Sequence, residues 1–227
     1  MDSRPFWPTA FERLGIHDAQ AEAALIAAAE IRSVASGSVI IAQDDDDDMV
    51  FIILDGEARV VLLSASGQEI WIDALQAGAV IGELAVLTEQ RRTSEIIAEQ
   101  DCMLACFPAR DFLALSADHG ALGLALARVL AQRVHHTTQR MFELSALSAT
   151  GRVYAELLRI SEPSESGETR YIRPKPTWTV LAQKVNTSRE TASRTISDLE
   201  KRGLLRRLDD GFELVDPDQL SRLSSTN

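Results

Sequence analysis

The feature that most constrains the fold is a change along the chain in the spacing of apolar residues. From Val34 to about Phe107 they form short runs or alternate with polar residues: Val39–Ala42, Val50–Leu54, Ala58–Leu63, Glu69–Leu75, Ala79–Ile81, Ser94–Ala98 and Cys102–Phe107. Turn-forming pairs separate several of these runs, at Asp55-Gly56, Ser66-Gly67 and Ala77-Gly78. Many short strands at such spacing are typical of an antiparallel barrel or sandwich.

Helical spacing flanks this region on both sides. Residues 9–33 are rich in alanine and predict short N-terminal helices. A longer helix is predicted from about His119 to Leu147. In its second half apolar residues and one threonine recur at alternating intervals of four and three, at Leu130, Val134, Thr137, Met141 and Leu144. This seam predicts a homodimer formed through the helix, although a helix packed on its own barrel remains the alternative.

The predicted long helix ends where the sequence Ser148-Ala-Thr-Gly151 breaks the apolar pattern, and Ser148 is suited to cap a following helix. The 227 residues are enough for two compact domains. We therefore expect an α+β chain with a β-barrel domain at 1–117, a dimerisation helix at 118–147 and a second domain at 148–227.

The charge is distributed unevenly between these parts. The net charge is -11, yet residues 1–148 carry 10 Lys and Arg against 22 Asp and Glu, whereas residues 149–227 carry 13 against 12. Within 173–207 nine basic residues face only three acidic ones. An acidic body with one small basic face predicts a single element that docks on DNA.

The basic segment also has the pattern of two short helices joined by a tight turn. Thr177 is placed to cap the first helix, Asn186 suits a left-handed turn, and 187–190 (Thr-Ser-Arg-Glu) fits a capping box that opens the second. Leu204–Leu208 and Gly211–Val215 predict a two-stranded wing. Such a winged helix-turn-helix reads the major groove of double-stranded DNA. The residues predicted to contact DNA are Thr177, Ser188, Arg189, Glu190, Thr191, Arg194, Lys201 and Arg206.

A candidate anion site lies between residues 78 and 94. Gly82-Glu83-Leu84-Ala85 predicts a tight turn into a short helix, where backbone N–H groups approach an anion. Arg91 or Arg92 supplies a bidentate phosphate partner, and Thr93 and Ser94 supply hydroxyls. Glu83 suits a sugar hydroxyl.

Three motifs together resemble the CRP/FNR family of transcription regulators, in their order along the chain. They are the phosphate-binding cassette at 82–94, the pair Thr137-Thr138 on the long helix, and Ser188-Arg-Glu-Thr-Ala-Ser-Arg194. The resemblance implies a jelly-roll cyclic-nucleotide-binding domain followed by a winged helix-turn-helix. It covers about residues 34 to 215.

The resemblance also implies roles for individual residues. In the cassette, Gly82, Glu83, Leu84 and Ala85 begin the motif, Arg92 binds the cyclic phosphate, and Thr93 and Ser94 follow it. Thr137 and Thr138 would bond the adenine of cyclic AMP from the two subunits of a dimer. Arg189, Glu190 and Arg194 would read a TGTGA-type half-site of a palindrome. RNA polymerase is a further implied partner.

Two departures from the cassette keep other effectors open. Arg91 stands where proline is frequent, and Glu95 stands where a small or hydroxyl residue is usual. A regulator that binds cyclic GMP or another effector, or none, is therefore an alternative. A second alternative is a cyclic-nucleotide-binding interaction module whose winged helix binds protein.

Several classes of protein are not supported. The sequence has no nucleophile–base constellation, so we expect neither an enzyme nor catalytic residues, and no metal is predicted. Asp44–Asp48 indicates a solvated loop rather than a calcium site. Cys102 and Cys106 suit a reducing compartment. Without an apolar run of about 20 residues or a signal peptide, the sequence predicts a cytoplasmic protein that does not bind membranes.

Overall fold

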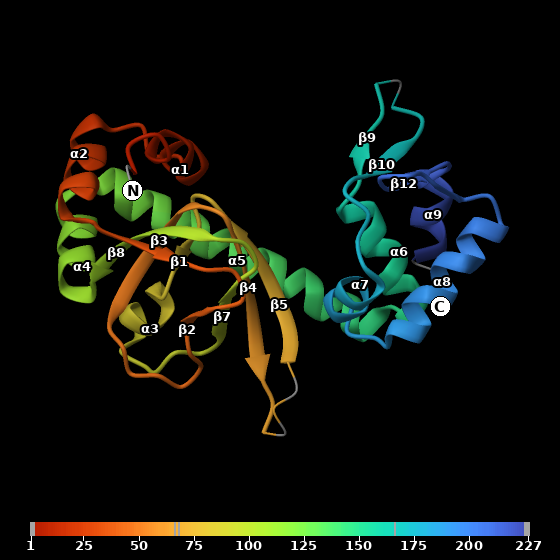
Figure 1. Ribbon diagram of the computed structural model, residues 1–227, viewed down its shortest axis with the longest axis horizontal. Helices are drawn as coiled ribbons and strands as arrows, with labels where there is room; N and C mark the ends of the chain where they lie inside the picture. The colour runs from red at the N-terminus through yellow and green to blue at the C-terminus, as the bar shows by residue number, and fades with distance from the viewer. Residues whose placement is uncertain (1–2, 66, 68, 166, 225–227) are drawn as a thin grey trace. The chain divides into compact units, whose positions relative to one another are not determined.

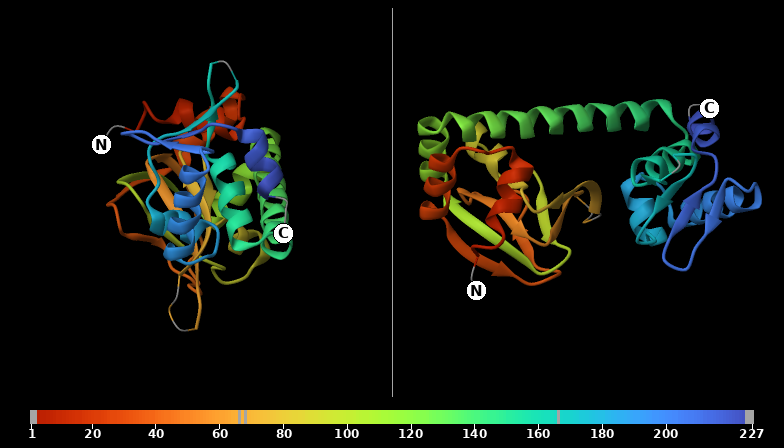
Figure 2. Two further views of the ribbon diagram at one scale, coloured as in Figure 1. Left: turned by 90° about the vertical axis from the view of Figure 1, so that its right-hand side faces the viewer. Right: turned by 90° about the horizontal axis from the view of Figure 1, so that it is seen from above.

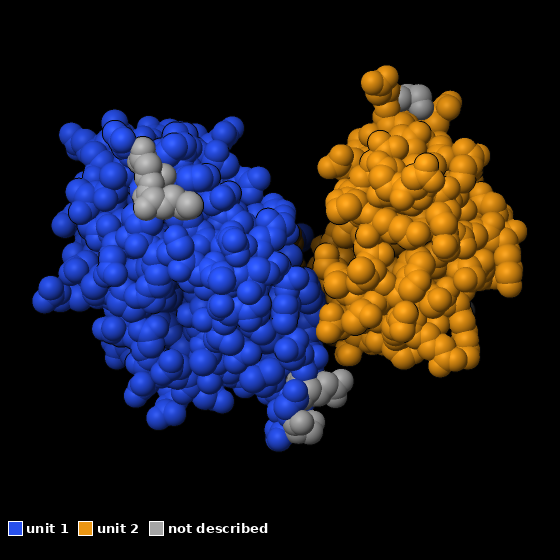
Figure 3. Space-filling view, viewed as in Figure 1, with its two compact units in different colours: residues 1–135 blue, residues 136–227 orange. Residues whose placement is uncertain are grey.

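The structure is a computed structural model that describes residues 3–65, 67, 69–165 and 167–224. The chain divides into two compact units, Met1–His135 and His136–Asn227, which Figure 3 colours separately. Each unit is described by itself. Ser66, the first residue of one predicted turn, lies outside the described residues.

Two antiparallel sheets form the body of the first unit. The strands are β1 (Glu30–Val34), β2 (Val39–Ile41), β3 (Met49–Asp55), β4 (Glu57–Leu63), β5 (Glu69–Gln76), β6 (Val80–Ile81), β7 (Glu95–Ala98) and β8 (Cys102–Pro108). One four-stranded sheet has the order β1-β8-β3-β6 and the other β2-β7-β4-β5. The predicted antiparallel fold is confirmed, as a jelly roll of two sheets rather than one closed barrel (Figure 1).

Strand β3 shows how the sequence places the core. Phe51 and Ile53 pack between the two sheets with residues such as Ile96 of β7. Val50 and Ile52 point to the opposite face, where helices cover the sheet. These helices are α1 (Trp7–Leu14), α2 (Ala19–Ala28), α4 (Ala109–Asp118) and the first half of α5 (Gly120–Ala146), seen in Figures 1 and 2. Because both faces are buried, β3 is an unbroken apolar run instead of an alternating one.

The N-terminal prediction is partly wrong. The alanine-rich spacing predicts helices over 9–33, whereas Glu30–Val34 forms β1, paired with β8 from Glu30↔Cys106 to Val34↔Cys102. Strand pairing with a segment some seventy residues away overrides the local helix propensity. Helix α4 is also absent from the predictions, and its Phe112 packs on Phe107 with ring centroids 5.9 Å apart.

The second unit is a winged helix with its own core. Its elements are α6 (Ala149–Arg159), β9 (Glu162–Pro163), β10 (Arg170–Ile172), α7 (Trp178–Lys184), α8 (Arg189–Lys201), β11 (Leu205–Arg207), β12 (Phe212–Leu214) and α9 (Pro217–Ser224). The sheet order is β11-β12-β10-β9. Ser148 caps α6 as predicted, since its Oγ accepts a hydrogen bond from Gly151 N at 3.1 Å. The α+β class is confirmed.

The long helix α5 matches the predicted helix closely. Of the predicted seam, Leu130 is half-buried and packs against the core of the first unit. Val134, Met141 and Leu144 are exposed within the chain, at 67%, 65% and 48%. Apolar side chains exposed in a row on one helix are unusual in a monomer. In the described part of the chain no single helix meets both the length and the apolarity that a bilayer span requires; α4 and α5 do so only as a bent pair.

Candidate ligand site and DNA-binding surface

At the turn formed by Gly82, other groups lie close to the backbone. Gly82 has φ 86°, a left-handed backbone, and is followed directly by α3 (Glu83–Thr88). A Cβ atom at this position would lie 2.6 Å from Arg92 Nη1 and 2.6 Å from the carbonyl oxygen of Met49. Only glycine therefore lets the Arg92 guanidinium sit against this turn.

Arg92 is the central charged group of the first unit. It is 2% exposed. Its Nη1 donates to Gly82 O at 2.7 Å, and its Nη2 donates to Met49 O at 2.5 Å and to Asp47 Oδ2 at 3.2 Å. Its Nε is buried and has no hydrogen-bond partner among the described residues. A buried guanidinium with an unsatisfied donor is chemically suited to an anion such as phosphate.

The acidic run 44–48 contacts this arginine. Arg92 N donates to Asp45 O at 3.0 Å, and Asp44 N donates to Arg92 O at 2.9 Å. Asp47 pairs with the guanidinium and is only partly exposed. The prediction of a merely solvated loop is therefore wrong for Asp47, because a partner 45 residues away fixes it. Among the described residues no group of His, Cys, Asp and Glu is arranged to hold a metal ion.

Glu83 is the second buried charge of the site. It is 1% exposed and forms an ion pair with Arg133 of α5, whose Nη2 also donates to Val80 O at 2.6 Å. Burial raises the pKa of the Glu83 carboxyl above its ordinary value, and the Arg133 charge opposes this rise. Sequence reasoning missed Arg133. A signal was present, because Arg133 continues at helical spacing the stripe of Leu122, Leu126 and Val129 that packs on the core.

The remaining predicted ligand residues differ in their surroundings. Ala85 is buried, whereas Leu84 is 42% exposed. Thr93 is exposed and Ser94 half-buried. Thr137 and Thr138 lie on α5 in the second unit with exposed side chains. The first unit thus brings together Gly82, Glu83 and Arg92 with two residues that the sequence did not indicate, Asp47 and Arg133.

The helix-turn-helix has the predicted local structure. Thr177 Oγ1 accepts a hydrogen bond from Val180 N at 3.3 Å and caps α7. Asn186 at the turn has φ 49°, in the left-handed region. The inward face is buried as expected, at Leu181, Ala182, Val185, Ala192, Ile196 and Leu199.

The predicted capping box at 187–190 is wrong by one residue. Ser188 is the N-cap of α8, and its Oγ accepts from Thr191 N at 3.1 Å. Thr187 instead donates its N–H to Ala182 O and closes the turn. Glu190 is consequently released from capping and forms an ion pair with Arg194.

The outer surface of α8 and the wing carries the predicted DNA-contacting side chains. Arg189, Glu190, Arg194 and Lys201 are exposed and Thr191 is half-buried. No hydrogen bond or ion pair from the described residues engages the Arg189 guanidinium. On the wing Arg206 pairs with Glu213 at 2.8 Å. A shallow hollow on this unit is lined by Lys175, Pro176, Thr177, Trp178, Thr179, Arg189 and Arg207.

Comparison with known proteins agrees with this division of the chain. Residues 31–119 match the cyclic nucleotide-binding domain family, and residues 151–223 match the Crp-like helix-turn-helix domain family. The cAMP-activated global transcriptional regulator Vfr of Pseudomonas aeruginosa is 28% identical over 77% of this chain and 83% of its own. The cAMP-activated global transcriptional regulator CRP of Salmonella typhimurium is 27% identical over 75% and 82%. These relatives are transcription regulators and not enzymes.

Solved structures share the fold. A CooA variant from Carboxydothermus hydrogenoformans superposes with a TM-score of 0.77 at 19% identity, over 88% of this chain and 90% of that one. The c-di-GMP-responsive global regulator CLP of Xanthomonas campestris gives 0.74 at 21%, over 87% and 99%. At these identities the likeness concerns the fold.

Proposed function

The chain belongs to the CRP/FNR family of transcription regulators, and we propose that it is a homodimer whose affinity for DNA is controlled by a cyclic nucleotide, cyclic AMP first of all. The observation that carries the proposal is the buried Arg92 with its unsatisfied Nε. A guanidinium this deep in a protein requires anionic partners. The relatives Vfr and CRP are named as cAMP-activated, which supports cyclic AMP as the effector.

Each residue of the cassette would make a different contact with the nucleotide. Arg92 would bind the cyclic phosphate, Gly82 would let the ligand approach the backbone, and Glu83 would accept from a sugar hydroxyl. Leu84, Ala85, Thr93 and Ser94 would complete the cassette. Asp47 already pairs with Arg92 at 3.2 Å, so it would compete with the phosphate and lower the affinity.

The long helix would supply both the dimer and the adenine contact. Its exposed side chains Val134, Met141 and Leu144 suit burial against a second copy of the helix. Thr137 and Thr138 would bond adenine. Ligand binding would favour the arrangement of the two helices that spaces the recognition helices by about 34 Å, one turn of DNA.

The DNA site proposed is a palindrome of TGTGA-type half-sites. The free guanidinium of Arg189 is suited to a bidentate contact with guanine, and Glu190 to cytosine. Ser188, Thr191, Arg194, Thr177, Lys201 and Arg206 would hold the remaining base and phosphate contacts. RNA polymerase as a partner, and action in the cytoplasm, belong to the same proposal.

Fluorescence anisotropy with a labelled palindromic duplex tests the proposal. Cyclic AMP should raise the affinity for the palindrome, and cyclic GMP should do so less. Equal affinity with and without nucleotide would favour a regulator that binds another effector or none, and a stronger response to cyclic GMP would favour a cyclic GMP regulator. Arg91 and Glu95, the two departures from the cassette, are the reason for this alternative. No preference for the palindrome over random DNA would favour a winged helix that binds protein.

A further inference from the structure

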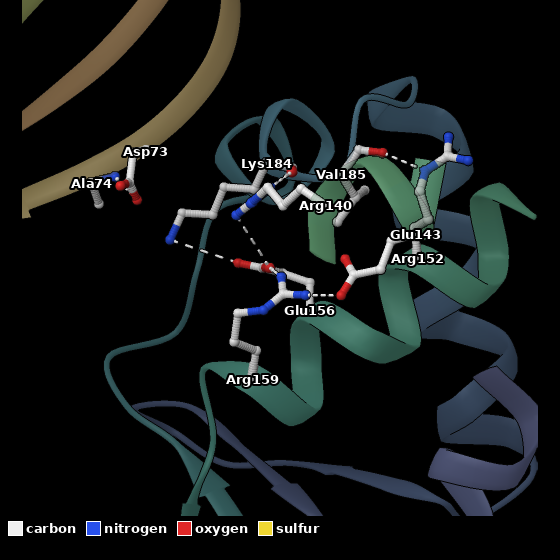
Figure 4. A network of polar contacts seen from close by, with 9 residues as sticks. All are labelled: Asp73, Ala74, Arg140, Glu143, Arg152, Glu156, Arg159, Lys184 and Val185. Atoms are coloured by element: carbon white, nitrogen blue, oxygen red, sulfur yellow. Dashed lines mark hydrogen bonds and ion pairs between the residues drawn. The ribbon is translucent and has the colours of Figure 1, made fainter. Parts of the chain in front are cut away.

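The second unit contains a cluster of charged side chains that neither the ligand site nor the DNA surface uses. We call it the Glu156 network, and Figure 4 shows it: Arg140, Glu143, Glu156, Arg159 and Lys184. The first two lie on α5, the next two on α6 and Lys184 at the end of α7. All five belong to the same compact unit.

Glu156 is the centre of the network. It is 1% exposed. Its carboxylate pairs with Arg159, lies 3.8 Å from Arg140 Nη2 and lies 3.9 Å from Lys184 Nζ. A buried carboxylate persists as an ion only when cations surround it. Here those cations come from three helices, so one buried charge ties α5, α6 and α7 together.

The turn of the helix-turn-helix is held from the same side. Arg140 Nη1 donates to Lys184 O at 2.6 Å, at the end of α7. Arg152 of α6 donates from Nε to Val185 O at 2.8 Å and from Nη2 to Asn186 O at 3.0 Å. The last carbonyls of a helix lack backbone partners, and cations near them are favourable. Two guanidiniums therefore fix the turn that precedes the recognition helix α8.

The junction between α5 and α6 is bridged as well. Arg152 Nη1 donates to Leu147 O at 3.0 Å, and Arg159 pairs with Glu143 of α5. These contacts span Ser148 to Gly151, the segment where the sequence breaks the apolar pattern of the long helix. The end of α5 is thereby linked to the helix-turn-helix at several points rather than only by the chain.

We propose that Glu156 is a positioning residue for the recognition helix. By holding Arg140, Arg159 and Lys184 it makes the last turns of α5, α6 and the α7 turn move as one body. A rotation of the end of α5 is then transmitted to α8. Only the predicted effect on DNA binding rests on the proposed function. The coupling of α5, α6 and α7 by Glu156 does not depend on it.

The mechanical part is tested by the distance between two spin labels, at Gln139→Cys on α5 and Gln183→Cys on α7. Labelled chain is diluted in an excess of unlabelled chain, so that only distances within one chain are measured. We expect one narrow distribution for the parent protein and a broader one for Glu156→Gln. The matched control is Glu162→Gln, the same change at an exposed position of the same unit, which should leave the distribution unchanged.

The consequence for DNA is tested with palindromes of altered spacing. The parent protein should lose about tenfold in affinity when base pairs are inserted between the half-sites, and Glu156→Gln should lose much less. Affinity for a single half-site should stay unchanged, which a general loss of folding would not allow. Arg140→Met should act in the same way, and the double variant should add little.

The outcomes separate the two claims. Unchanged label distances in Glu156→Gln, with a folded protein, would overturn the positioning role whatever the DNA result. A parallel fall of half-site and palindrome affinity would also overturn it, since the residue would then act on stability alone. Broadened distances in a protein that binds no palindrome would uphold the network and reject the proposed DNA site.

Discussion

The two arginine sites of this molecule differ in how they are held. Arg92 is 2% exposed and its guanidinium contacts two carbonyls and a carboxylate. Arg194 on the recognition helix has a side chain 76% exposed, and it pairs with a neighbour one helical turn away. Because Arg92 is buried and both its Nη atoms are already bonded, an incoming anion must bond Nε, which no described residue engages, or displace Asp47. Because Arg194 is exposed, its ion pair with Glu190 can exchange for other partners and weakens as the salt concentration rises.

The largest predicted effect follows from removing the buried charge. Arg92→Ala should abolish the rise in Tm that cyclic AMP produces, since the phosphate then has no cation, a loss of about 3 kcal/mol or more in binding. Thermal unfolding with and without nucleotide measures it. Arg110→Ala, at a position with a side chain 92% exposed, is the control and should keep the full ligand-induced shift.

A second prediction concerns the space beside that charge. Gly82→Ala should lower the free energy of unfolding by about 2 kcal/mol, because a left-handed backbone disfavours alanine and its methyl would meet Met49 O. Denaturant unfolding measures this change. Gly37→Ala is the matched control, as it has a similar φ of 80° with open space around it, and it should cost clearly less. Equal costs would show that close packing plays no part.

A substitution in the recognition helix should have a smaller effect on binding. Arg189→Ala is expected to cost about 1–3 kcal/mol of binding to the palindrome and to relax specificity at one base pair. A panel of duplexes with single substitutions checks both effects. Full retention of affinity and of base preference would remove Arg189 from base readout.

The smallest effect is expected at the edge of the DNA surface. Lys201→Ala should weaken binding to all sequences alike and reduce the slope of log affinity against log salt by about 1. Titrations at several salt concentrations give that slope. A sequence-dependent loss would instead assign Lys201 to base contact.

Turns and helix caps can be predicted from the sequence, whereas roles that depend on residues far away in the chain cannot. The left-handed Asn186, the caps Thr177 and Ser148, and the glycine turn before α3 are all determined by neighbouring residues. Asp47 and Arg133 gain their roles from partners 45 and 50 residues away. Strand β1 likewise depends on β8. The spacing of residues within a short stretch of sequence cannot predict contacts between residues this far apart.

The Glu156 network illustrates the same limit. Its acid and bases are spread over α5, α6 and α7, and in the sequence they look like ordinary surface charges. Only packing of the three helices turns Glu156 into a buried carboxylate.

The most direct test of the proposed ligand site is calorimetric titration of the purified protein with cyclic AMP, with cyclic GMP as the comparison. We expect saturable heat with cyclic AMP, weaker binding of cyclic GMP, and loss of both in Arg92→Ala. The absence of heat with either nucleotide, or binding that survives in Arg92→Ala, would contradict the claim that Arg92 and the Gly82 turn form a cyclic-nucleotide site.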